Sequence, residues 1–111
     1  MSEEHFQISP AELAERLRSD SPPLLLDVRE AGEHATAALP GSKLIPLAQV
    51  PFRVGEIADW KEREVVVYCH HGVRSLMAIG WLKLRGFSKL HNLTGGIDRW
   101  SVEVDPDCPR Y

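Results

Sequence analysis

The sequence predicts an α/β domain with a mainly parallel, five-stranded sheet that is flanked by helices on both faces. Two patterns lead to this prediction. Short apolar runs rich in β-branched residues alternate with segments that carry helical signals, which is typical of parallel strands joined by crossover helices. Within "EVVVY" at 64–68, residues 65–68 also form a continuous run of strand-forming side chains, as expected of a central strand covered on both faces.

The predicted strands are short apolar segments that end near turn-forming residues. A proline directly follows the third strand and cuts it short. In chain order the strands are "QIS" at 7–9, "LLLDV" at 24–28, "KLI" at 43–45, "EVVVY" at 64–68 and "KLHNL" at 89–93.

The first predicted helix, over residues 9–19, has the clearest start signal of the chain. Ser9 is a favourable N-cap, Pro10 suits the first helical position, and Glu12 completes a capping box. The segment "REAGEHATAA" at 29–38 predicts a short second helix that ends before the turn "LPGS".

Four further segments are assigned by pattern. A helix from about 51 to 58 is expected, although Gly55 weakens it. The helix predicted at 75–85 ends before Gly86, which suits a left-handed C-cap. Its large apolar side chains follow a helical stripe at Met77, Trp81 and Leu84. The segment "GGIDRW" predicts a final turn or helix, and the tail "DPDCPRY" an irregular surface segment.

Length and composition favour one small domain over residues 1–111, with an irregular tail from about 100 to 111. The chain has 111 residues, of which 43% are hydrophobic, and its formal net charge is -3. A chain of this length buries enough surface to form a stable core without a disulfide or structural metal.

The charge and the absence of a basic stripe argue against nucleic acid as a partner. No run is apolar enough for a membrane span, and no leader peptide is evident, so a cytoplasmic location is expected.

Cys69 is the main candidate for chemistry because it stands where a buried strand turns into a helix. Sites in open parallel sheets form at the carboxyl ends of strands. Gly72 permits a tight turn whose N–H groups, with those of the following helix, create a nest for an anion. Arg74 adds a positive charge with a planar fork of donors. These features favour the thiolate, which is the nucleophilic form of cysteine.

Simpler interpretations of these residues also exist. A cysteine beside an apolar strand is most often inert packing, but this loop serves no obvious packing purpose. His70 and His71 suggest a metal site, yet adjacent residues seldom converge on one ion, so no metal is expected. They are expected instead at the rim of the site, although a Cys–His catalytic pair is also conceivable. Three isolated histidines are expected in surface or satisfied positions: His5, His34 and His91.

Four motifs in order give the chain a resemblance to the single-domain rhodanese family of sulfurtransferases, over nearly its whole length. "LLLDVRE" resembles the strand with the family's Asp-x-Arg pair, here Asp27 and Arg29, and "LPGSKLIPL" its Pro-Gly-Ala…Ile-Pro segment. "VVVYCHHGVRS" is similar to the active-site loop Cys-x-x-Gly-x-Arg-Ser, and "GFSKLHNLTGGIDRW" to the closing Gly-Gly…Trp segment. The chain departs from the pattern at Ala37 and Ala38, where many members have Gly-His.

The resemblance implies a rhodanese-like fold and a covalent persulfide intermediate on Cys69, with no cofactor. Cys69 would take a sulfane sulfur from thiosulfate or a persulfide donor, and cyanide or a thiol would accept it. The substrate-binding residues would be the rest of the loop: His70, His71, Gly72, Val73, Arg74 and Ser75. For Asp27 and Arg29 the expected role is structural support at the strand end.

Two alternatives remain beside the small-molecule sulfurtransferase. The domain could be a persulfide carrier that relays sulfur to a dedicated partner protein. It could also be a cysteine-dependent phosphatase or arsenate reductase, since those enzymes use similar Cys…Arg loops. Related phosphatases have one residue more between the cysteine and the arginine than the four found here, so sulfur chemistry is favoured.

Overall fold

The computed structural model describes residues 6–111 and contains all five predicted strands, alternating with helices. The strands are β1 (Gln7–Ile8), β2 (Leu24–Asp27), β3 (Lys43–Leu44), β4 (Val65–Tyr68) and β5 (Leu90–Leu93). The helices are α1 (Pro10–Leu17), α2 (Ala31–Thr36), α3 (Val50–Arg53), α4 (Val73–Leu84) and α5 (Gly96–Glu103). Two short segments are 3₁₀ helices, η2 (Leu47–Gln49) and η3 (Val54–Trp60).

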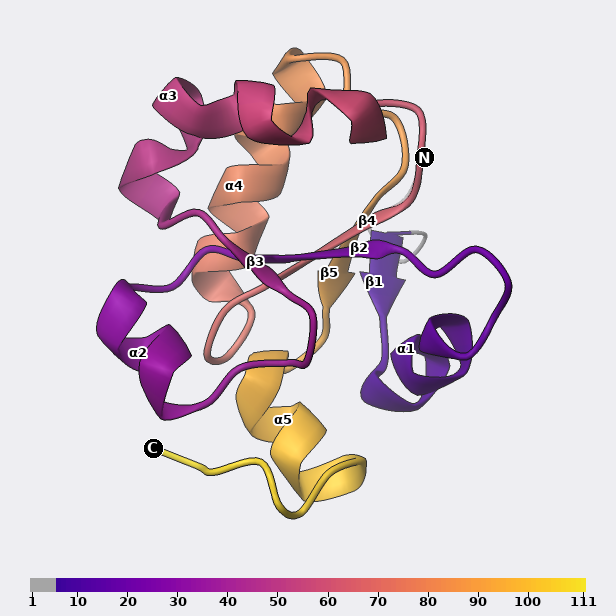
Figure 1. Ribbon diagram of the computed structural model, residues 1–111, viewed down its shortest axis with the longest axis vertical. Helices are drawn as coiled ribbons and strands as arrows, with labels where there is room; N and C mark the ends of the chain where they lie inside the picture. Colours follow the sequence, from indigo (N-terminus) through magenta and orange to yellow (C-terminus); the bar gives the residue numbers. More distant parts are fainter. Residues whose placement is uncertain (1–5) are drawn as a thin grey trace.

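The strands form one sheet in the order β1-β5-β4-β2-β3, and every strand pair is parallel (Figure 1). β4 lies in the middle, and all four of its residues are fully buried. In the register of the sheet, Asp27 at the end of β2 stands beside Tyr68 at the end of β4. The loops that follow these two strands, with Arg29 in one and Cys69 in the other, therefore begin at the same edge of the sheet.

The two faces of the sheet support two separate hydrophobic cores. Val65 and Val67 of β4 pack into the core that includes Ile79 and Leu82 of α4, and Val66 and Tyr68 pack into the core that includes residues of α1 and α5. Because side chains alternate along a strand, one apolar run supplies both cores. Full burial of a valine or leucine contributes about 1.5–3 kcal/mol relative to leaving it exposed. β4 is therefore a rigid support for the residue that follows it, Cys69.

The helix predicted at 75–85 exists as α4, but the predicted apolar stripe is not its buried face. Met77 and Leu84 are 64% and 84% exposed, and Trp81 is only partly buried, packed at the margin of the core. The side chains that face the core are Ser75, Ala78, Ile79 and Leu82. The predicted stripe and the buried face both repeat at helical spacing. Since apolar residues occur on more than one side of this helix, periodicity alone did not identify the face that is buried.

Several other element boundaries also differ from the predictions: α1 ends at Leu17 and α4 begins at Val73. The helix expected at about 51–58 is divided: α3 ends at Arg53, and Ile57 in η3 has non-helical angles (φ −120°, ψ 18°) while it is buried. The low helix propensity of Gly55 is consistent with this division. The second helix ends at Thr36, and Ala37 is already extended. The predicted cap features are present, since Ser9 and Glu12 exchange both hydrogen bonds of a capping box.

The tail is shorter and better packed than expected. α5 continues to Glu103, so the irregular segment begins at Val104 instead of at about 100. Cys108 lies in the segment "DPDCPRY" that was predicted at the surface, but it is only 9% exposed and packs in the core that includes residues of α1 and α5. A turn in which Cys108 N donates to Asp105 O (3.0 Å) directs the thiol back toward the core. Across residues 6–111, every helix is too short or too polar to span a lipid bilayer.

Candidate active site

The Cys69 sulfur lies in a cradle of N–H groups made by the turn between β4 and α4. Gly72, at the N-cap of α4, has φ +100°, a left-handed conformation that favours glycine. In this conformation Gly72 N donates to Cys69 Sγ over 3.1 Å, and Ser75 N donates over 3.4 Å. The thiol is 1% exposed. These donors and the start of α4 can stabilise negative charge on the sulfur.

A polar side-chain network continues from the sulfur into the neighbouring strand. Ser75 Oγ lies 3.5 Å from Cys69 Sγ, and its hydroxyl donates to Asn92 Oδ1 on β5. Asn92 in turn donates to Gln7 Oε1 on β1 over 3.1 Å. Because the single proton of the Ser75 hydroxyl is donated to Asn92, Ser75 Oγ is left as a hydrogen-bond acceptor toward the S–H group of Cys69. Sequence reasoning missed Asn92, whose only local signal is its place in the "HNLTGG" segment.

The first turn of α5 holds the other side of the Cys69 loop. Ile97 N donates to Cys69 O (2.9 Å), and Asp98 N donates to His70 O (3.1 Å). Gly96 has φ +64°, and a Cβ built on it would stand 2.5 Å from Cys69 O, closer than real Cβ atoms approach. The loop and the helix can therefore meet only because residue 96 is a glycine.

Arg74 does not present a free positive charge to the site. Its Nη1 and Nη2 atoms donate to the two carboxylate oxygens of Glu33 on α2, over 2.7 and 2.9 Å. These hydrogen bonds hold the pKa of Glu33 well below its usual range and raise that of Arg74. The sequence predicted Arg74 as a substrate-binding residue with a positive charge, and the fold brings a carboxylate from another element against that charge.

Asp27 and Arg29 form a fully buried pair at the end of β2. Arg29 Nε and Nη2 donate to Asp27 over 2.9 and 2.7 Å, and Nη2 also donates to Ala37 O over 2.6 Å. The remaining guanidinium nitrogen, Nη1, donates to Tyr111 Oη over 2.7 Å. These contacts join the strand end, the segment after α2 and the C-terminal residue, and none of them goes to Cys69.

The two loop histidines form an aromatic stack with Tyr111. His70 lies 4.0 Å from the Tyr111 ring and 3.9 Å from the His71 ring, measured between ring centroids. Burial lowers the pKa of His70, and its Nε2 is buried without a hydrogen-bond partner among the described residues. The carboxyl end of the chain lies beside α2 in Figure 1, where the Tyr111 hydroxyl donates to Glu33 Oε2 over 2.8 Å.

The adjacent histidines converge more than spacing predicted. One ligand atom each from His70, His71 and Asp98 lies within 4.8 Å of the others, because α5 brings Asp98 to the loop. Arg110 already donates to both carboxylate oxygens of Asp98, over 2.9 and 3.2 Å. Two of the isolated histidines have carboxylate partners, with His34 Nδ1 2.7 Å from Asp27 and His91 Nε2 2.9 Å from Glu64; His5 lies outside the described residues.

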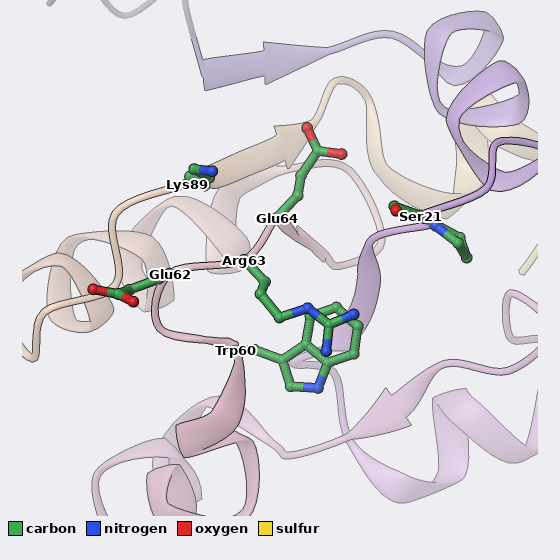
Figure 2. Close-up of a pocket in the computed structure, with 7 residues that line it drawn as sticks. Ser21, Trp60, Glu62, Arg63, Glu64 and Lys89 are labelled. Atoms are coloured by element: carbon green, nitrogen blue, oxygen red, sulfur yellow. The ribbon is translucent and has the colours of Figure 1, made fainter.

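A surface hollow of about 360 Å³ lies at the opposite edge of the sheet, where β4 and β5 begin (Figure 2). Within it, the Arg63 guanidinium lies over the Trp60 ring at 4.0 Å. The lining residues are Ser21, Pro22, Trp60, Glu62, Arg63, Glu64 and Lys89. None of them belongs to the Cys69 loop, so the hollow does not form part of the candidate active site.

Comparison with known proteins identifies relatives over most of the chain. The family model described as "Rhodanese-like domain" matches residues 9–103. A "Sulfurtransferase" of Allochromatium vinosum is 36% identical over 95 residues, which are 86% of this chain and 87% of that protein. The chain is 28% identical to a solved "Rhodanese-like Domain Protein" of Staphylococcus aureus, with a TM-score of 0.80 and coverage of 95% of this chain and 97% of that one.

Other relatives contain this domain as one part of a longer protein. A "Rhodanese-like/PpiC domain-containing protein 12, chloroplastic" of Arabidopsis thaliana is 40% identical over 89 residues, 78% of this chain and 30% of that protein. A "Putative sulfur carrier protein" of Bacillus subtilis is 36% identical over 99 residues, 89% of this chain and 52% of that protein. The chain thus spans about a third to a half of the length of these two relatives.

Proposed function

Because the chain belongs to the rhodanese-like domain family, we propose that it is a sulfurtransferase whose Cys69 carries the sulfur in transit. The observation that best supports the proposal is the cradle of Gly72 N and Ser75 N around Cys69 Sγ. A sulfur nucleophile that receives and releases an anionic group needs negative charge stabilised at each stage. Preorganised N–H donors supply this in a water-excluded site.

In the proposed first half-reaction, the Cys69 thiolate attacks the outer sulfur of thiosulfate or of a persulfide donor. A bond forms between Cys69 Sγ and that sulfur, the S–S bond of the donor breaks, and its electron pair leaves with sulfite or with the donor thiolate. Cys69 then holds a persulfide with its negative charge on the terminal sulfur. The bound sulfur needs no separate cofactor, because the cysteine itself carries it.

In the second half-reaction an acceptor attacks the terminal sulfur of the persulfide. Cyanide would leave as thiocyanate and a thiolate as a persulfide, while the bond to Cys69 Sγ breaks and Sγ regains its negative charge. The acceptor could also be a thiol on a partner protein, in which case the domain acts as a relay. The description of the Bacillus subtilis relative as a putative sulfur carrier supports testing protein acceptors beside small ones.

Cys69→Ser tests the proposal, with Cys108→Ala as the matched control at the second cysteine. Each protein is incubated with thiosulfate, examined for the added mass of one sulfur atom, and assayed for thiocyanate after addition of cyanide. We expect the mass increase and the turnover in the native chain and in Cys108→Ala, and neither in Cys69→Ser. Full turnover by Cys69→Ser would refute the role of Cys69.

Aryl phosphate hydrolysis tests the phosphatase alternative. Only four residues separate Cys69 from Arg74, and Gly72 N and Ser75 N both donate to the single atom Cys69 Sγ. A phosphoryl group has three equatorial oxygens to be accommodated and needs a wider ring. We expect no appreciable phosphate release by the native chain. Phosphatase turnover without persulfide formation would replace the sulfurtransferase proposal.

A further inference from the structure

The carboxylate that binds Arg74 bears on which sulfur donors the site accepts. Glu33 occupies both terminal nitrogens of Arg74, over 2.7 and 2.9 Å. The side chains of Arg74 and Glu33 are 35% and 22% exposed, so the pair is only partly screened by solvent. In this bidentate pair the Glu33 carboxylate accepts hydrogen bonds from the same Arg74 N–H groups that an anionic substrate would use.

The position of Glu33 is itself held by further contacts. Its Oε1 accepts from Glu30 N over 3.0 Å in the capping box at the start of α2. Its Oε2 accepts from the Tyr111 hydroxyl over 2.8 Å, and that hydroxyl also accepts from Arg29. Displacing the carboxylate from Arg74 would therefore disturb the helix cap and the packing of the C-terminal residue.

The other arginines of this network are matched with carboxylates in the same way. Arg29 is bonded to Asp27, and Arg110 to Asp98 beside His71. Because each of these guanidinium groups is paired with a carboxylate, the network as a whole is close to electrically neutral. An incoming anion would meet the N–H cradle of Cys69 and no unpaired guanidinium of this set.

We infer that Glu33 is a specificity-determining residue that makes the site favour neutral or monoanionic sulfane-sulfur donors over dianionic thiosulfate. The inference rests on the proposed sulfur transfer through Cys69. Because Glu33 neutralises Arg74, the second negative charge of a dianion has no compensating cation at this pair, whereas a donor with one charge less does not need it. Persulfides and thiosulfonates meet this description and offer the same outer sulfur to Cys69.

Methanethiosulfonate and thiosulfate make a suitable pair of probes, because they differ by one charge and both transfer their outer sulfur. The quantity compared is the ratio of kcat/KM for thiosulfate to kcat/KM for methanethiosulfonate, with cyanide as acceptor and at constant ionic strength. The variants are Glu33→Gln, Arg74→Ala and the double variant. Glu56→Gln serves as the matched control, since Glu56 forms an Arg–Glu pair with Arg53 and a bridge to Lys43 instead.

Glu33→Gln should raise this ratio about 10-fold, equivalent to about 1.4 kcal/mol, because it removes a negative charge and releases Arg74 for the dianion. Arg74→Ala alone should lower the ratio, because it leaves the Glu33 carboxylate unpaired, and it should also abolish most of the gain in the Glu33→Gln background. Glu56→Gln should leave the ratio at the native value.

Two results would overturn the inference. One is an unchanged ratio in Glu33→Gln while both donors still load Cys69 with sulfur. The other is an equally low ratio in Arg74→Ala and in the double variant, which would mean that Arg74 already serves the dianion and that the Glu33 charge has no effect of its own. A failure of both donors to load Cys69 of the native chain would instead refute the sulfurtransferase proposal, and mass measurement distinguishes this case.

Discussion

Replacement of Gly96 by alanine tests how α5 supports the Cys69 loop. Gly96 has φ +64°, where a non-glycine residue costs about 1–2 kcal/mol. The added Cβ would also stand 2.5 Å from Cys69 O and still closer to His70 O. Relief of this contact requires the loop backbone to move away from α5, which strains the hydrogen bonds from Ile97 N and Asp98 N.

The expected loss of stability follows from these two contributions. Each strained hydrogen bond contributes about 0.5–1.5 kcal/mol, so Gly96→Ala should lower the free energy of unfolding by about 2–5 kcal/mol. Gly41→Ala is the matched control: Gly41 has φ +77°, but a Cβ there has no atom within 4 Å. That variant should lose only the conformational part, about 1–2 kcal/mol.

Urea unfolding followed by circular dichroism measures both losses. An unchanged slope of the free energy of unfolding against urea concentration would show that each variant exposes the same amount of surface on unfolding as the native chain. In parallel, the rate of Cys69 alkylation by iodoacetamide reports on the loop, since the native thiol is 1% exposed. We expect faster alkylation in Gly96→Ala than in Gly41→Ala. Equal stability losses and equal alkylation rates in the two variants would refute the claim that α5 holds the loop through a close contact at residue 96.

Three further changes test other parts of the site. Asn92→Asp places a carboxylate next to the hydroxyl that faces Cys69, so alkylation of Cys69 at fixed neutral pH should slow, whereas an unchanged rate would exclude coupling through that network. Arg29→Leu leaves Asp27 charged and buried and should cost about 3–5 kcal/mol in urea unfolding; a loss below 1 kcal/mol, on the scale of an exposed pair, would contradict the importance of this pair. Because burial lowers the pKa of His70 from its usual value near 6.5, the unfolded state binds its proton more readily, and the free energy of unfolding should decrease as the pH falls below that value. His70→Gln should reduce this dependence, and an identical pH profile would show that other groups cause it.

The sequence alone determined the features that depend on neighbours along the chain. The five strands were predicted because their apolar runs are short and are bounded by turn residues, and the capping box of Ser9 and Glu12 formed because its atoms lie three residues apart. Gly72 and Gly86 have the positive φ expected of a tight turn and a helix C-cap. The place of Cys69 after the central strand was predicted for the same reason, since a parallel sheet puts such a residue at its carboxyl edge.

Only the tertiary structure decided which side chains meet across the site. Glu33 is 41 residues from Arg74 and 78 from Tyr111, and Asn92 is 17 from Ser75. The partners in these pairs come from separate elements, and their contact depends on how α2, β5 and the tail pack against the loop. The buried face of α4 was decided in the same way, because its apolar residues satisfy more than one helical stripe. Periodicity along a chain reports local geometry, whereas charge neutralisation at Arg74 depends on distances between elements that exist only after the sheet and helices have assembled.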